Sequence, residues 1–141
     1  MNQTTTTSRE QANATTSIYY QTADRSFSEC RQRLISYLIK LNNSLNENLA
    51  DLSHALLNRF CDSLVDYLSA GHFRVFQRIA LMPTEYAAIE ASTRTAMHFN
   101  DRFGQLQDIE LVEVKAALEQ LAQELSTRFE LEDDMLGSVS N

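Results

Sequence analysis

The sequence has little of the turn chemistry that a β-sheet protein needs. Its 141 residues include three glycines, one proline and no tryptophan. Tight turns between short strands are built mostly from Gly, Pro, Asn and Asp, so this scarcity argues against a β-sandwich or β-barrel. Apolar runs are also short, and none approaches the roughly 18 residues that a membrane span requires. We therefore expect a helical protein without a membrane segment.

Cysteine is scarce too. Cys30 and Cys61 are the two cysteines, and both fall at apolar positions of the helical pattern. Two such residues make no disulfide framework, so we expect reduced cysteines in the core of a cytoplasmic protein. The opening MNQTTTTSREQANATTS lacks the apolar stretch of a secretory signal, which agrees with that location.

The residue patterns of common enzymes are missing. The sequence has no glycine-rich phosphate loop, no Gly-x-Ser-x-Gly motif and no paired cysteines at zinc spacing. A di-iron bundle needs two Glu-x-x-His pairs, whereas this chain offers only Asp51-x-x-His54. We expect no catalysis, no metal and no cofactor.

Charge is unevenly distributed along the chain. The segment from Asp108 to Asp134 holds nine acidic and two basic residues, so its own net charge equals that of the whole chain, −7. Duplex nucleic acid is a poor partner for such a chain, because binding it requires clustered Lys and Arg. A basic protein partner fits better, although an acidic helix face can also serve solubility alone.

Apolar residues recur at intervals of three and four along most of the chain, as in amphipathic helices. Residues 1–17 include six threonines and are expected to form a flexible or weakly helical tail. Asn42-Asn43 should end the first long helix, and Ser44 with Glu47 should form a capping box for the second. The pattern allows the second helix to end at Gly71 or to continue in phase to Ile79.

The remaining boundaries complete four helices. Pro83-Thr84 should begin the third helix, Gly104 should cap its end, and Asp108 should cap the fourth. Short connections predict an all-α, antiparallel up-and-down bundle in a single domain over residues 18–141. The predicted apolar faces are Phe27, Cys30, Leu34, Leu38 and Leu41; Leu45, Leu49, Leu52, Leu56, Phe60, Leu64 and Leu68; Ile89, Thr93, Ala96, Met97, Asn100 and Phe103; and Leu111, Val114, Leu118, Leu121, Leu125, Phe129 and Leu136.

Four segments make the sequence more specific. The longest is FCDSLVDYLSAGHF at residues 60–73, and shorter ones are Asp24-Arg25, FNDR at 99–102 and RFELED at 128–133. Together they resemble the Rsd/AlgQ family of anti-sigma factors, in order, over roughly residues 20–136. Ser26 departs from the family pattern, which has Trp after Asp-Arg, and the segment between Arg78 and Tyr86 is shorter than usual.

The resemblance implies a cytoplasmic helical bundle that binds the primary sigma factor of bacterial RNA polymerase. In that family the target is the C-terminal, promoter-reading domain of sigma, a basic helix-turn-helix module. Covering that domain blocks its contacts with core polymerase and promoter DNA, which favours alternative sigma factors as growth slows.

The same resemblance indicates candidate sigma-binding residues. Asp66 matches the acidic residue that the family uses against a basic sigma side chain. Asp62 lies one helical turn earlier and is expected to share its face. Tyr67, Gly71, His72 and Phe73 are further candidates, with core packing the competing role for Tyr67 and Phe73. Arg128, Glu132 and Asp133 are expected to form intramolecular ion pairs instead.

Three alternatives stay open at this point. A phosphotransfer bundle would use His72 as the phosphoryl acceptor, although the bulky Phe73 beside it argues against this. A divergent paralogue would bind another sigma factor or a different regulator. A weakly self-associating bundle would have its own copy as a partner.

Overall fold

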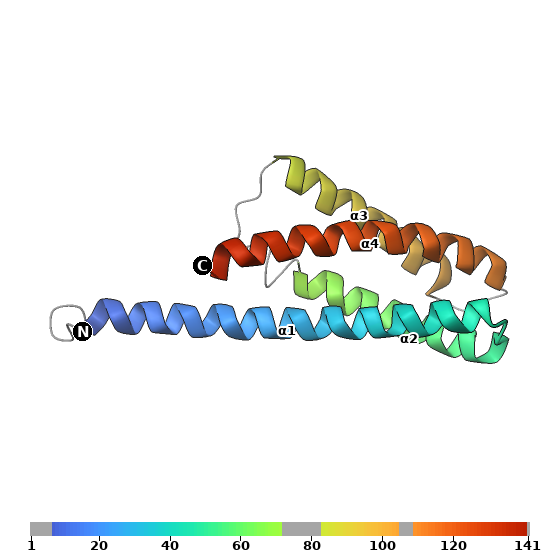
Figure 1. Ribbon diagram of the computed structural model, residues 1–141, viewed down its shortest axis with the longest axis horizontal. Coiled ribbons are helices and arrows are strands. Elements are labelled where there is room, and N and C mark those ends of the chain that lie inside the picture. The colour runs from blue at the N-terminus through green and yellow to red at the C-terminus, as the bar shows by residue number, and fades with distance from the viewer. Residues whose placement is uncertain (1–6, 72–82, 105–108, 141) are drawn as a thin grey trace.

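The computed structural model describes residues 7–71, 83–104 and 109–140, with side chains between 25 and 135 in those ranges. Four helices account for most of them: α1 (Thr7–Asn46), α2 (Ala50–Gly71), α3 (Pro83–Phe103) and α4 (Leu111–Ser140). Figure 1 shows the helices running alternately in opposite directions, with α1 beside α2 and α3 beside α4. The described ranges contain no strand. The predicted all-α up-and-down bundle is confirmed.

Helix α1 begins earlier than the expected domain. It starts at Thr7 and runs without a break to Asn46, so it includes most of the segment predicted to be a flexible or weakly helical tail. The domain boundary between residues 17 and 18 stays a prediction.

The turn between α1 and α2 differs from the predicted capping box. The amide of Asn48 donates to the carbonyl of Leu45 (3.2 Å), and the amide of Leu49 donates to the carbonyl of Ser44 (3.0 Å). These two bonds form a Schellman motif, which ends α1 after Asn46. Asn48 supplies the left-handed residue that the motif needs, with φ of 58°.

Ser44 therefore lies inside the last turn of α1, and the prediction that it caps α2 was wrong. Its hydroxyl donates to the carbonyl of Leu41 (2.9 Å) and lies 2.7 Å from the hydroxyl of Ser53 on α2. Both serines are buried. Because each hydroxyl has a partner, α1 and α2 can bury the two serines at little cost. Helix α1 therefore continues past Asn42-Asn43, where it was predicted to end.

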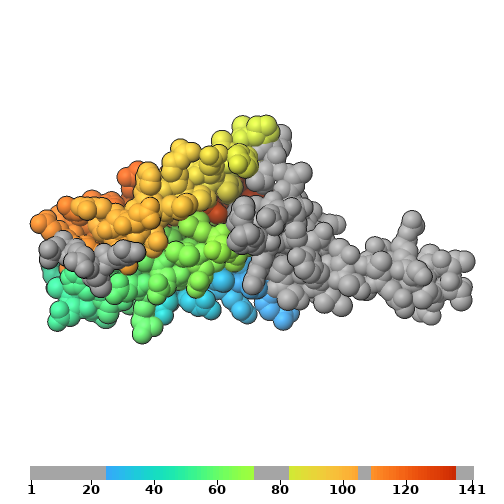
Figure 2. Space-filling view, turned by 180° about the vertical axis from the view of Figure 1, so that it is seen from behind, coloured from blue at the N-terminus to red at the C-terminus, as the bar shows by residue number. Residues whose placement is uncertain are grey.

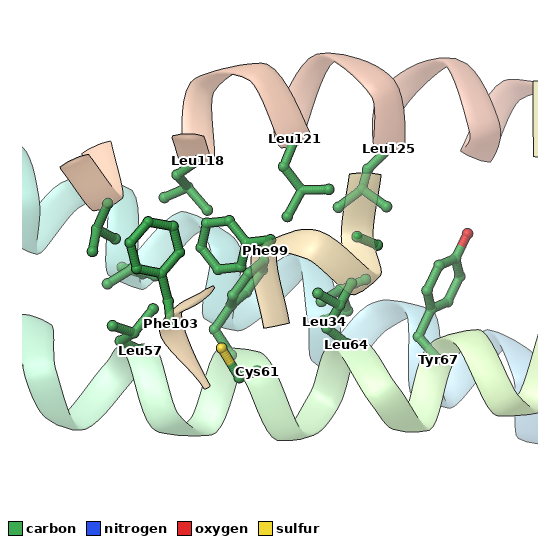
Figure 3. Packing of buried hydrophobic residues seen from close by; sticks show 14 of the residues in the cluster. Leu34, Leu57, Cys61, Leu64, Tyr67, Phe99, Phe103, Leu118, Leu121 and Leu125 are labelled. Carbon is green, nitrogen blue, oxygen red and sulfur yellow. The ribbon is translucent and has the colours of Figure 1, made fainter. Parts of the chain in front are cut away.

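The core follows the central axis of the bundle (Figure 3). Phe27, Leu34 and Leu41 on α1 are fully buried, as the apolar spacing predicts. Most of the predicted α4 face is buried as well. The buried apolar side chains that pack together among the described residues are Phe27, Leu34, Leu41, Leu45, Leu57, Phe60, Cys61, Leu64, Tyr67, Ala70, Ala96, Phe99, Phe103, Val114, Leu118, Leu121 and Leu125.

The packed faces of α2 and α3 are rotated from the predicted ones. Leu49 and Leu52 are 43% and 49% exposed, so these two residues of the stripe predicted for the second helix do not pack in the core. Leu57 is buried instead, in line with the buried Ser53. On α3, Met97 is 53% exposed and Phe99 is buried. None of the predicted stripes included a serine, whereas Ser53 and Ser92, whose hydroxyls have partners, also face the core.

The two ends of α3 agree with the sequence. Pro83 begins the helix, where its missing amide leaves no hydrogen bond unmade. Gly104 follows the helix, and its amide donates to the carbonyl of Asn100 (2.7 Å). A Cβ at Gly104 would overlap that same carbonyl, so the close approach requires glycine.

The predicted cap at Asp108 and the predicted continuation of the second helix to Ile79 fall outside the described residues. In the described part, the carbonyl of Glu110 accepts the first backbone bonds of α4, from the amides of Glu113 (3.0 Å) and Val114 (3.3 Å).

Candidate functional site

A groove lies between α2 and α3, which pack side by side on the face shown in Figure 2. It encloses about 640 Å³ and is lined by Asp62, Val65, Asp66, Asn100, Asp101 and Gly104. We call this feature the acidic groove, because three of its six lining residues carry carboxylates. Asp62 and Asp66 stand one turn apart on α2, and Asp101 stands on α3.

The acidic groove has no internal counter-charge among the described side chains. All three carboxylates are exposed, and no ion pair within the described ranges includes any of them. The nearby Arg102 bonds to Glu113 of α4 instead, at 2.6 Å. Val65 is 44% exposed and gives the groove one apolar lining side chain. This arrangement suits a ligand with positive charges flanking an apolar group.

The structure brings some of the predicted site residues together and separates others. Asp62 and Asp66 share the groove as expected. Gly71 is buried at the last residue of α2. His72 and Phe73 lie outside the described residues, so their predicted roles stay predictions.

Tyr67 belongs to the core and is absent from the groove surface. It is fully buried, and its ring packs against Phe27 and Phe129, with centroid distances of 5.6 Å to each. Figure 3 shows the side chain pointing from α2 toward α4. Its hydroxyl donates to Glu132 Oε2 at 2.5 Å. Tyr67 is therefore placed for packing, which was its competing role, and has no surface for direct contact with a partner.

Glu132 accepts bonds from three helices although it is 0% exposed. Tyr67 of α2 donates to Oε2, Arg128 Nε of α4 lies 3.2 Å from Oε2, and Arg31 Nη1 of α1 lies 3.4 Å from Oε1. Burial raises the pKa of Glu132, although the Tyr67 bond and the charges of Arg128 and Arg31 act in the opposite direction. Burial also raises the pKa of Tyr67.

Arg128 extends the same arrangement to α3. Its Nη1 donates to Thr93 Oγ1 (2.6 Å) and to Ser92 Oγ (3.2 Å), and its guanidinium lies over the Tyr67 ring at 5.2 Å. The predicted ion pairs of Arg128 and Glu132 are thus confirmed, and Asp133 pairs with Arg31 at 2.7 Å. We call the following residues the polar cluster: Arg31, Tyr67, Ser92, Thr93, Arg128 and Glu132.

Of the six residues that line the acidic groove, sequence reasoning assigned a binding role only to Asp62 and Asp66. Asn100 and Asp101 belong to the FNDR segment, which supported the family resemblance but received no role in binding. Asn100 was placed on an apolar face, and it is half-buried beside Gly104. The signal for Asp101 was its place in that segment, but only the packing of α3 against α2 shows that it faces the same groove as Asp66.

The described residues offer no grouping of three or more His, Cys, Asp or Glu side chains suited to a metal ion. Cys61 is buried, and that burial raises the pKa of its thiol to about 12. A protonated, buried thiol is a poor nucleophile. Across the described ranges, no helix has the length and apolar character needed to cross a membrane.

The fold and the groove together define a four-helix bundle with an acidic groove between α2 and α3. The family model described as "Regulator of RNA polymerase sigma(70) subunit, Rsd/AlgQ" matches residues 5–140. The chain belongs to the Rsd/AlgQ family, a family of transcription regulators that act on sigma.

Curated relatives agree with this assignment. The protein named "Regulator of sigma D" from Yersinia enterocolitica is 35% identical, over 60% of this chain and 59% of the relative. Its namesake from Yersinia pseudotuberculosis is 31% identical, over 75% of this chain and 72% of the relative. A third, from Enterobacter sp. strain 638, is 34% identical, over 64% and 62%. No solved structure gives a significant match.

Proposed function

We propose that this protein is an anti-sigma factor that binds the C-terminal, promoter-reading domain of the primary sigma factor through the acidic groove. Family membership supports the choice of sigma as partner. The acidic groove is the observation that supports this binding site. A basic helix with Lys or Arg on either side of an apolar residue would complement the three carboxylates and Val65.

Binding at the groove would act by occlusion. A sigma domain held there could contact neither promoter DNA nor core polymerase, so alternative sigma factors would gain access to core enzyme. The proposal needs no catalysis, cofactor or membrane and places the protein in the cytoplasm, where RNA polymerase works. A weak homodimer would compete with sigma only if it covered α2 or α3.

Calorimetric titration into the isolated C-terminal domain of the host's primary sigma factor tests the proposal. We expect one-to-one binding that weakens as salt rises, since exposed ion pairs are screened within roughly 10 Å at ~0.1 M salt. Asp66→Asn should weaken binding about three- to tenfold, because one groove carboxylate loses its charge.

Glu119→Gln is the matched control. It removes one exposed carboxylate from α4, away from the residues that line the groove. Equal losses in the two variants would show a general charge effect and would argue against the groove. No binding by the wild-type chain to a folded sigma domain would refute the anti-sigma proposal and would favour a divergent partner.

A further inference from the structure

The polar cluster connects all four helices of the bundle at one level. Arg31 comes from α1, Tyr67 from α2, Ser92 and Thr93 from α3, and Arg128 and Glu132 from α4. Arg128 and Glu132 are 3% and 0% exposed, so the cluster lies in the interior. Such a buried network is costly unless its members are paired, and a paired network fixes one arrangement of the elements that it joins.

The two helices of the acidic groove depend on this network for their polar connection. In the described ranges, no hydrogen bond runs directly from a side chain of α2 to one of α3. The connection passes through α4: Tyr67 donates to Glu132, Arg128 donates to the same carboxylate, and Arg128 also donates to Thr93. Direct contact between α2 and α3 is apolar, as in the edge-to-face pair of Phe60 and Phe99 at 5.5 Å.

The connection is close to the groove on both helices. Tyr67 follows Asp66 directly, so the residue that anchors α2 adjoins a groove carboxylate. Thr93 precedes Asp101 by eight residues, or about 12 Å along a helix axis, so movement of α3 at Thr93 would carry Asp101 with it. Apolar packing alone would allow a small sliding or rotation between the helices, whereas the hydrogen bonds favour one register.

We propose that Ser92 and Thr93, acting through Arg128, are positioning residues that set the spacing between Asp101 on α3 and the two aspartates on α2. This inference rests on the proposed function of the acidic groove. Neither residue lines the groove, so neither touches the partner there. Their effect on binding is transmitted through the placement of α3.

The test variant is Ser92→Ala combined with Thr93→Val, which keeps side-chain volume and removes both hydroxyl partners of Arg128. We expect about tenfold weaker binding to the sigma domain. In a double-mutant cycle, the coupling between Asp66→Asn and Asp101→Asn should also change in this background, because the spacing of the two carboxylates changes. A partner affinity equal to wild type would overturn the proposal.

Ser44→Ala combined with Ser53→Ala is the matched control. It also removes two buried hydroxyls, but at the end where α1 meets α2. We expect this control to lower thermal stability while leaving the affinity for sigma unchanged. Equal affinity losses in the control and in the test variant would show that general destabilisation, and not positioning, is responsible.

A measurement without the partner separates this inference from the proposed function. Spin labels on Ser69→Cys in α2 and Met97→Cys in α3, both at exposed positions, report the distance between the helices in a Cys30→Ala, Cys61→Ala background. The distance distribution should shift or broaden in the Ser92/Thr93 variant and stay unchanged in the serine control. An unchanged distribution in both variants would refute positioning even if the wild-type chain binds sigma. A wild-type chain that fails to bind sigma would refute the proposed function and leave the distance result intact.

Discussion

At the scale of single residues, Glu132 has the greatest structural consequence. A carboxylate with no exposed surface is stable in the fold only when donors surround it, and here Arg31, Tyr67 and Arg128 provide them. Sequence spacing predicts the pair of Arg128 and Glu132, because they are four residues apart on one helix. It cannot predict Arg31 or Tyr67, which reach Glu132 only after the helices have packed.

Replacing Glu132 by Gln should destabilise the fold. The amide NH2 of Gln cannot accept a hydrogen bond, so at least one of the donors of Arg31, Tyr67 and Arg128 would lose its buried acceptor, and we expect a loss of about 1–3 kcal/mol in the free energy of unfolding. Chemical denaturation of both chains measures the difference. A stability equal to wild type would contradict a structural role for the carboxylate.

The same pair of chains should show a dependence on pH. Burial raises the folded pKa of Glu132 above 4.5, and the titratable groups in contact with it are Arg31, Tyr67 and Arg128. A raised folded pKa means that the folded chain holds this proton more tightly than the unfolded chain does. The resulting stability is fully present below the unfolded pKa, near 4.5, and is lost as pH rises through the folded pKa. The stability of wild type relative to Glu132→Gln should therefore fall as pH increases over that window.

At the scale of helices, the sequence predicted element number and type better than element ends and faces. Leucines repeat at helical spacing along α2, but they occupy two overlapping faces, and only packing decides between them. The buried serines decide in favour of the face with Ser53, Leu57 and Leu64. A pattern of apolar residues gives no weight to a serine whose hydroxyl bonds within the core.

Asn48 offers a test of how α1 ends. Its left-handed φ of 58° is tolerated by Asn, preferred by Gly and unfavourable for Ala. Asn48→Ala should lower the free energy of unfolding by about 1 kcal/mol, while Asn48→Gly should leave it unchanged or raise it slightly. Thermal melts of the three chains measure this order. An Ala variant as stable as the Gly variant would contradict the Schellman turn.

At the scale of the whole molecule, the charge that dominates the sequence differs from the charge that forms the site. The acidic segment lies mainly on α4, where Glu132 is buried, Asp133 pairs with Arg31, and Glu113 pairs with Arg102. The groove carboxylates instead come from α2 and α3, whose local charge is unremarkable in the sequence. Net charge therefore predicted a basic partner, while family resemblance and helix packing were needed to locate the groove.

The most direct test of the central claim compares two exposed valines. Val65 lies in the acidic groove, and Val112 lies at the start of α4 and is 80% exposed. Each is replaced in turn by a photo-crosslinking phenylalanine analogue, and the chain is irradiated with the C-terminal domain of the primary sigma factor. We expect a crosslinked product from position 65 that salt and Asp66→Asn reduce, and little product from position 112. Crosslinking from position 112 without any from position 65 would place the partner elsewhere and contradict the account.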